Sequence, residues 1–364
     1  MTRGTRPTAR SAASPWRRPV RVGALTVGGA VLLVSGSVGL MAGEVKLARR
    51  WVGRPTERPP ATSGWYGHYV DEPLRLATLG DSSVAGIGVE YAHETMAAIL
   101  AAGLAAMARR PVRLTNVAVS GSRTSDLSRQ VDRVLEDAPD VALIVIGAND
   151  VTGFVSPKDS AAVLGEQVAR LVGAGVPVVV GTCPDLGTVR PVLPPLRQVG
   201  WLWSRMLARQ QTIAAVEAGG RSVSLGALLG PTFRLDPLMW SPDRFHPSAD
   251  GYVASASALL PSVAVAAGVL PEVPAEPTPA RTMSVAAAAT AAVSQDGTEV
   301  VEIGPAAPGP TAPGGAVPSG AVPSGAVRRR ALRRLPARVR RRRPPRVPPA
   351  ASDADGGRET GTSR

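Results

Sequence analysis

The sequence predicts a three-layer α/β/α domain over residues 71–268, with a central sheet of five parallel strands. Short runs rich in Val, Ile and Leu alternate there with longer segments of helical periodicity, an order typical of a parallel sheet covered on both faces. Polar turns containing Gly, Ser, Asn and Asp follow the apolar runs, at the edge where open parallel sheets bind ligands.

The elements of this domain are expected in strict alternation, and about 200 residues suffice for one buried core. Strands are expected at the apolar runs 74–79, 112–119, 141–146, 176–182 and 222–228. Helices are expected at the amphipathic stretches 93–109, 125–137, 159–173, 197–218 and 248–266.

The region before the domain reads as a membrane attachment. Residues 1–21 carry six arginines, residues 22–43 contain no charged side chain, and residues 44–70 form a linker. At about 1.5 Å per residue the uncharged run is long enough to span a bilayer. It predicts an uncleaved anchor in preference to a cleaved secretory signal, whose apolar region is shorter. The heavier basic count before the run predicts a cytoplasmic N-terminus and an extracytoplasmic domain at the cell membrane.

The region after the domain, 269–364, is rich in Pro, Ala and Gly and is expected to be disordered. Its arginine cluster, 328–346, holds 11 arginines. The net charge of +13 comes from the ends of the chain, because residues 70–270 contain 16 basic and 18 acidic side chains. Anionic lipid or an anionic wall polymer is the favoured partner of the cluster, nucleic acid is disfavoured, and a solvated tail without a specific partner is equally compatible.

No motif for a metal or an organic cofactor is present, and none is expected to be needed. The chain has one cysteine, Cys183, and three histidines at dispersed positions: His68, His93 and His246. Cys183 ends an apolar run and is expected to be an inert buried thiol.

Four short segments carry the residue types of nucleophilic catalysis. They are Gly80-Asp81-Ser82, Ser120-Gly121-Ser122, Gly147-Ala148-Asn149-Asp150, and Asp243-Arg244-Phe245-His246. A serine needs a base to remove its proton, and His246 is the candidate. Asp243, three positions earlier, can orient the imidazole and stabilise its cation. Ser82, His246 and Asp243 are therefore the predicted catalytic residues.

These four blocks resemble the SGNH (GDSL-type) hydrolase superfamily across residues 74–266, with GDSS where the name-giving motif has GDSL. The resemblance implies the flavodoxin-like SGNH-hydrolase fold and hydrolysis of a carboxylic ester through an acyl-enzyme. It also implies an oxyanion hole made by the backbone N–H groups of Ser82 and Gly121 and the side-chain amide of Asn149.

Other interpretations stay open at this point. Acyl transfer to an envelope glycan or lipid uses the same acyl-enzyme, and a non-catalytic envelope-binding protein would keep the fold. Asp81 and Asp150 read as loop-organising acceptors, with a glycosidase carboxylate pair as the alternative. Three tryptophans either line the substrate cleft or pack between helix and sheet: Trp201, Trp203 and Trp240. The ester itself is a small molecule, a lipid or an acylated glycan.

Overall fold

The computed structural model describes residues 58–272, 284–294, 298–303 and 326–331. The expected basic N-terminus and membrane segment (1–21 and 22–43) and most of the arginine cluster lie outside the described residues. Expectations for those segments stay predictions.

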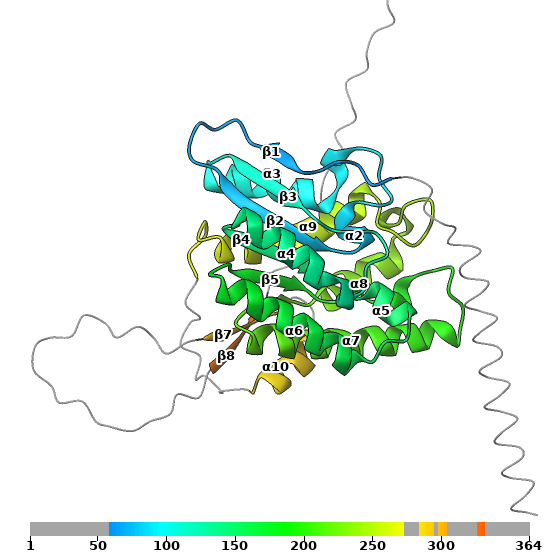
Figure 1. Cartoon of the computed structure of the whole chain (residues 1–364). Coiled ribbons are helices and arrows are strands. Elements are labelled where there is room, and N and C mark those ends of the chain that lie inside the picture. The colour runs from blue at the N-terminus through cyan, green and yellow to red at the C-terminus, as the bar shows by residue number, and fades with distance from the viewer. Residues whose placement is uncertain (1–57, 273–283, 295–297, 304–325, 332–364) are drawn as a thin grey trace, which may run out of the picture. The chain divides into compact units, whose positions relative to one another are not determined.

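The described strands form one sheet in the order β1-β3-β2-β4-β5-β6-β7-β8 (Figure 1). Five central strands are parallel: β3, β2, β4, β5 and β6. At the two edges β1, β7 and β8 pair antiparallel, so the sheet formed by the described residues has eight strands: the five parallel ones that were predicted and three antiparallel edge strands that were not. Their bounds are β1 Gly64–Tyr66, β2 Leu74–Gly80, β3 Val112–Asn116, β4 Val141–Val145, β5 Val178–Gly181, β6 Arg221–Val223, β7 Thr298–Ile303 and β8 Ala326–Ala331.

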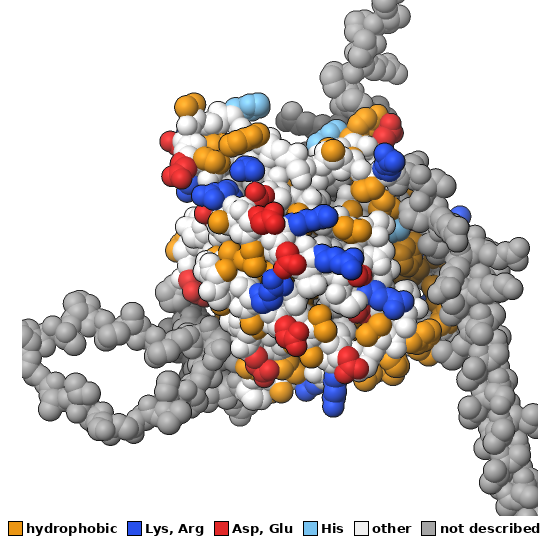
Figure 2. All heavy atoms as spheres, in the orientation of Figure 1, with side chains coloured by type: hydrophobic (Ala, Val, Ile, Leu, Met, Phe, Trp, Pro, Cys, Tyr) orange, Lys and Arg blue, Asp and Glu red, His pale blue; other side chains and the backbone are white. Residues whose placement is uncertain are grey.

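Helices cover both faces of the sheet, which confirms the α/β class. One face packs against α3 (Met96–Ala108) and α9 (Ala249–Ala266), the other mainly against α4 (Leu127–Asp137) and α6 (Pro157–Gly173), with Ala215 of α7 (Leu196–Glu217). Side chains of β4 alternate between the two buried layers, as the period of a strand requires. Basic and acidic side chains are interspersed over α4 and α6 (Figure 2).

Shorter helices follow the strands at the carboxyl edge of the sheet. They are α2 Ser82–Ala85, α5 Ala148–Thr152, α8 Leu225–Leu235 and the 3₁₀ turns η2 Ala92–Glu94, η3 Thr124–Asp126, η4 Leu186–Thr188 and η5 Pro237–Met239. The prediction of a strand over 222–228 is wrong beyond Val223, because α8 begins at Leu225. Leu225, Leu228 and Leu229 pack into the core at helical spacing, and so short an apolar run does not distinguish a strand from a helix.

Two flanking regions contain more structure than the sequence indicates. Strand β1 lies within the expected linker, and α10 (Val285–Ala292), β7 and β8 lie within the expected disordered tail. Ala288 and Ala292 of α10 pack with Val300 against Val216, so an alanine-rich helix is held there by tertiary contact.

Among the described residues, α9 is the helix long and apolar enough to cross a membrane by length and composition. Its side chains Tyr252, Leu259 and Val263 are fully buried against α3 and the sheet. Its apolar character is therefore accounted for by the core.

Candidate active site

The turn after β2 presents Ser82 at the start of a helix. Asp81 caps α2, since its Oδ1 accepts hydrogen bonds from the Ser83 N–H (3.0 Å) and the Ser83 hydroxyl (2.8 Å). Ser82 is the first residue of α2, where a backbone N–H has no acceptor within the helix. Gly80 allows the close approach of β2 to β4, because a Cβ there would collide with the Val145 carbonyl.

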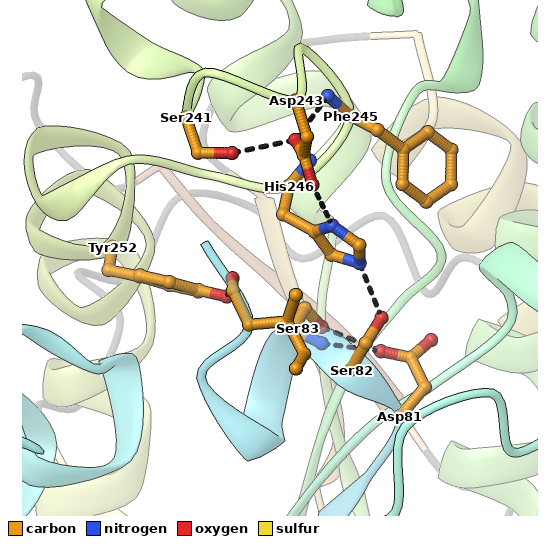
Figure 3. Close-up of polar contacts among 9 residues, drawn as sticks. Asp81, Ser82, Ser83, Ser241, Asp243, Phe245, His246 and Tyr252 are labelled. Carbon is orange, nitrogen blue, oxygen red and sulfur yellow. Dashed lines mark hydrogen bonds and ion pairs between the residues drawn. The ribbon is translucent and has the colours of Figure 1, made fainter. Parts of the chain in front are cut away.

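His246 lies between Ser82 and Asp243 and contacts both (Figure 3). Its Nε2 is 2.9 Å from Ser82 Oγ, and its Nδ1 is 2.6 Å from Asp243 Oδ2. The carboxylate can only accept, so the neutral imidazole carries its proton on Nδ1 and Nε2 accepts from the Ser82 hydroxyl. The structure thus brings together the three residues that the sequence predicts to be catalytic.

Asp243 is fixed by hydrogen bonds to both of its oxygens. Besides Oδ2 on the imidazole, Oδ1 accepts from the Ser241 hydroxyl (2.6 Å) and from the backbone N–H groups of Phe245 (2.8 Å) and His246 (2.9 Å). Burial by itself would raise the pKa of Asp243, but the hydrogen bonds from His246, Ser241 and Phe245 outweigh it and hold the pKa well below its usual range. An ionised carboxylate therefore faces the imidazole.

The turns after β3 and β4 are joined through Asn149. Its Nδ2 donates to the Ser122 carbonyl at 2.9 Å, next to Gly121. Gly121 has φ +85°, a left-handed conformation that favours glycine, and a Cβ there would meet no atom within 4 Å. The neighbouring Asp150 is buried and accepts from the Thr124 N–H and hydroxyl.

The two carboxylates beside the catalytic blocks act as loop-organising acceptors, as expected. Asp81 binds Ser83 within one turn, whereas Asp150 binds Thr124 and so joins the turn after β4 to the turn after β3. Burial raises the pKa of Asp81, which is 3% exposed. Both side chains hold backbone in place at the edge where Ser82 and Asn149 lie.

Two buried glutamine side chains form hydrogen bonds with the backbone at the ends of strands along this edge. Neither was predicted from the sequence. The Gln130 amide accepts from the Gly80 N–H (2.8 Å) and donates to the Gly80 carbonyl (2.9 Å). Gln211 donates to the Ile146 carbonyl (3.0 Å) and accepts from the Cys183 N–H (2.7 Å). A signal was present for Gln130, because it occupies the apolar stripe of its helix together with Leu127, Val131 and Val134.

The loop of His246 packs directly against the loop of Ser82. A Cβ on Gly88 would lie 2.7 Å from the Pro247 carbonyl oxygen and 3.0 Å from His246 Cβ. The hydroxyl of the fully buried Tyr252 donates to the Ile87 carbonyl at 2.6 Å, and burial raises its pKa well above the usual value. Helix α9 thereby fixes the spacing between nucleophile and base.

An apolar pocket of about 90 Å³ adjoins Ser82 and His246. Its walls include aliphatic and aromatic side chains from several elements: Met96, Val189, Leu225, Leu229, Phe233 and Trp240. Asp185 also lines it, 9% exposed and paired with Arg234 at 3.0 Å; burial raises the pKa of this carboxyl. The pocket extends the site on the side of α8.

The three tryptophans have different environments. Trp240 lines the pocket, whereas the Trp203 indole donates to the Val155 carbonyl and packs beside Val151 and Leu207. Trp201 is 40% exposed on α7. Trp240 therefore lies in the cleft wall, as one of the two expectations had it, whereas Trp203 packs between α7 and α5 and the residues that follow α5.

Neither a reactive thiol nor a metal-binding cluster is found in the described part of the chain. Cys183 is 1% exposed, and burial raises the pKa of its thiol well above the usual value, as expected for an inert core residue. No cluster of three His, Cys, Asp or Glu side chains able to hold a metal occurs among the described residues.

Known proteins resemble this chain over the same region. Residues 78–254 match the GDSL-like Lipase/Acylhydrolase family. The chain is 37% identical over 272 residues to the GDSL-like esterase Rv1075c of Mycobacterium tuberculosis, an alignment covering 71% of this chain and 86% of that protein.

Solved structures with similarity to the chain include TesA (19% identity, TM-score 0.45, 53% of this chain and 99% of that one). Another is a lipolytic G-D-S-L family protein of Veillonella parvula (17%, 0.43, 52% and 97%). A third is AlinE4, an SGNH-hydrolase family esterase (24%, 0.40, 54% and 98%). The identity to the mycobacterial esterase, over most of its length, decides the assignment: this chain belongs to the GDSL-like lipase/acylhydrolase family and is an ester hydrolase.

Proposed function

We propose that the protein hydrolyses a carboxylic ester through an acyl-enzyme on Ser82, with His246 as general base and acid and Asp243 as its orienter. The supporting observation is the continuous contact from Ser82 Oγ to His246 Nε2 (2.9 Å) and from Nδ1 to Asp243 Oδ2 (2.6 Å). Nucleophile, base and orienter are within hydrogen-bonding distance before substrate arrives.

The reaction follows from this geometry. As Ser82 Oγ bonds to the ester carbonyl carbon, its proton moves to His246 Nε2, and Asp243 stabilises the resulting imidazolium. The imidazolium then protonates the leaving alkoxide oxygen while the ester C–O bond breaks, which leaves the acyl group on Ser82. Water repeats the sequence with the same histidine and releases the carboxylic acid.

The oxyanion of each tetrahedral intermediate needs preorganised donors. We assign this role to the N–H groups of Ser82 and Gly121 and to the Asn149 amide. Asn149 uses one Nδ2 hydrogen on the Ser122 carbonyl, so its second hydrogen is free to donate. Removing one such donor typically costs about 3–4 kcal/mol of transition-state stabilisation, roughly 100- to 1000-fold in rate.

We assign the apolar pocket as the binding site of the acyl chain. It begins at Ser82 and is walled by side chains such as Leu225, Leu229 and Phe233, which offer favourable burial to methylene groups. The preferred substrate is therefore an ester whose acyl part is apolar and longer than acetyl.

The proposed place of action is the cell envelope. The uncharged run 22–43 would tether the domain, and the cluster 328–346 would bind anionic lipid or wall polymer. Protease added to intact cells that express the chain should remove the catalytic domain and leave the membrane-associated N-terminus. A domain resistant to protease until the cells are lysed would contradict this placement.

The central test uses p-nitrophenyl esters from acetyl to long chain, with the full-length chain and its Ser82→Ala variant. Turnover that vanishes in Ser82→Ala, together with covalent labelling of Ser82 by a fluorophosphonate, is the expected result. Adding an alcohol acceptor separates hydrolysis from acyl transfer, because transfer yields a new ester at the expense of free acid. Equal rates for the wild-type chain and Ser82→Ala would refute the serine mechanism.

A further inference from the structure

The solvent side of the first half of α7 has an unusual composition. Trp201, Leu202 and Met206 are 40%, 52% and 48% exposed, and Arg205 lies among them in the sequence. A surface helix ordinarily turns polar and charged side chains to water and its apolar stripe to the core. Here large apolar side chains cluster on the outside, which marks an interaction surface.

The charged side chains in and just before the first part of α7 are all positive. Residues 186–216 contain Arg190, Arg197, Arg205 and Arg209 and no acidic residue. Arg197 donates to the carbonyls of Val192 and Arg190, at 2.7 and 3.0 Å. Both acceptors are neutral, so neither of these contacts compensates the positive charge of Arg197.

Arg205 adds a positive charge within the apolar cluster and also interacts electrostatically with the Asp185 carboxylate, which immediately precedes this segment. Its guanidinium lies 5.1 Å from the centre of the Trp201 ring, a cation–π contact. The combination of indole, aliphatic side chains and arginine on one helix face is that of helices lying in a membrane interface.

This face borders the pocket beside Ser82. Gly187, in turn η4, packs so closely on Trp201 that a Cβ at Gly187 would lie 2.6 Å from Trp201 Cβ. Its neighbours Leu186 and Thr188 line the pocket. The first half of α7 also lies next to α5, at the carboxyl edge of the sheet (Figure 1).

We propose that the α7 face, defined as Trp201, Leu202, Arg205 and Met206, docks on an anionic lipid bilayer. The apolar side chains enter the boundary between headgroups and acyl chains, and the arginines of 186–216 contact anionic headgroups. Docking orients the domain so that the pocket beside Ser82 opens close to the lipid surface. This goes beyond the esterase activity, since it concerns a surface that takes no part in the chemistry.

The test exploits the single, buried cysteine of the chain. Met206→Cys and Met107→Cys form a matched pair, because the two methionines are 48% and 40% exposed on helices, and Met107 lies at the far end of α3. Each full-length variant is labelled with an environment-sensitive fluorophore and mixed with anionic or neutral vesicles that contain brominated lipid. The unsubstituted chain, whose Cys183 is 1% exposed, is the labelling blank.

An interfacial helix buries its apolar face about 5–10 Å into the lipid, so bromine should quench the label at position 206 at least about twofold more than the label at 107. The difference should shrink in neutral vesicles. Leu202→Cys should behave like Met206→Cys, and Ser82-dependent hydrolysis of a soluble ester shows that each variant is folded.

Equal quenching at positions 206 and 107 in folded protein would overturn the proposal, as would quenching at 206 that ignores lipid charge. Disulfide cross-linking between two copies through position 206 would also overturn it, by making a second copy the occupant. None of these outcomes bears on the esterase mechanism, which the soluble assay reads separately.

Discussion

The side-chain amide of Gln130 pairs with both backbone polar groups of Gly80, two residues before the nucleophile. The two hydrogen bonds, of 2.8 and 2.9 Å, resemble the backbone hydrogen bonds that a neighbouring strand makes, although Gln130 lies on helix α4. A further contact of 3.3 Å joins Gln130 Nε2 to the Ser122 hydroxyl, beside Gly121. One side chain therefore sets the Ser82 turn relative to the turn of a proposed oxyanion donor.

Replacing Gln130 with leucine should lower kcat more than it changes KM. The substitution leaves the buried Gly80 N–H unpaired, at a cost of about 1–3 kcal/mol of folding stability, whereas the Gly80 carbonyl keeps the hydrogen bond from the Val119 N–H at 3.2 Å. It also loosens the spacing between Ser82 and Gly121, and we expect kcat to fall roughly 10- to 100-fold. Steady-state kinetics and chemical denaturation measure the two effects.

Gln167→Leu is the matched control for that variant. Gln167 is also a buried glutamine, but its partner is Arg170 on α6 and it makes no contact with the site. A comparable fall in kcat for Gln167→Leu would show that the effect reflects stability alone.

Asp243→Asn should abolish most of the activity without unfolding the protein. An asparagine amide cannot accept from the imidazole and from the donors on Oδ1 at once, so His246 loses the tautomer that accepts the Ser82 proton. The corresponding change in a serine protease lowers kcat about 10⁴-fold, and we expect a loss of roughly 10³- to 10⁴-fold. Asp236→Asn, at the half-buried cap of η5, should retain wild-type kcat; retained activity in Asp243→Asn would refute the role of Asp243.

Gly121→Ala and Gly175→Ala should have equal effects on stability and unequal effects on catalysis. Both glycines have left-handed φ (+85° and +80°), and at neither would a Cβ meet an atom within 4 Å. Each alanine should cost about 1–2 kcal/mol of backbone strain. Only Gly121→Ala displaces a proposed oxyanion N–H, so kcat/KM should fall in that variant alone; equal kcat/KM in the two would remove Gly121 from the hole.

The free energy of unfolding of Asp81→Asn, measured relative to that of the wild-type chain, should increase as the pH rises. Burial raises the pKa of Asp81, so the folded state holds the proton more tightly than the unfolded state does. Wild-type stability from this group is complete below the unfolded pKa, about 3.9, and is lost as the pH rises through the folded pKa. Denaturation from about pH 3 to pH 7 measures the difference between variant and wild type, and a difference independent of pH would contradict the prediction.

Filling the pocket at Leu229 should shorten the preferred acyl chain. Leu229→Trp places an indole where methylene groups of the substrate are proposed to lie. The ratio of kcat/KM for octanoyl over acetyl esters should fall roughly 10-fold, since a methylene in such a pocket is worth about 1–3 kcal/mol. Leu238→Trp, at a 57% exposed site, is the control. An unchanged ratio in Leu229→Trp would show that the acyl chain lies elsewhere.

The amino-acid sequence was enough to predict the α/β class, the order of the core elements and the residues of the four blocks. The periodicity of apolar residues indicates which face of each strand and helix is buried. The carboxyl ends of parallel strands lie at the same edge of the sheet. For that reason Ser82 and Asn149 could be placed at one edge although they are far apart in the chain. His246, in the loop before the last helix, was assigned from the nearby Asp243 and from the resemblance to SGNH hydrolases.

The surroundings of those residues, by contrast, depend on tertiary packing and could not be predicted from the sequence. Gln130 and Gln211 are ordinary helix residues until folding aims them at Gly80 and Ile146, and no local pattern states the partner of a buried amide. Packing also outweighs local preference in two other places. It forms the edge strands β1, β7 and β8, and it makes α8 a helix where a longer strand was expected. The apolar pocket likewise arises where α8, α9 and the turn after β5 converge, because its shape is a property of their packing and of no single segment.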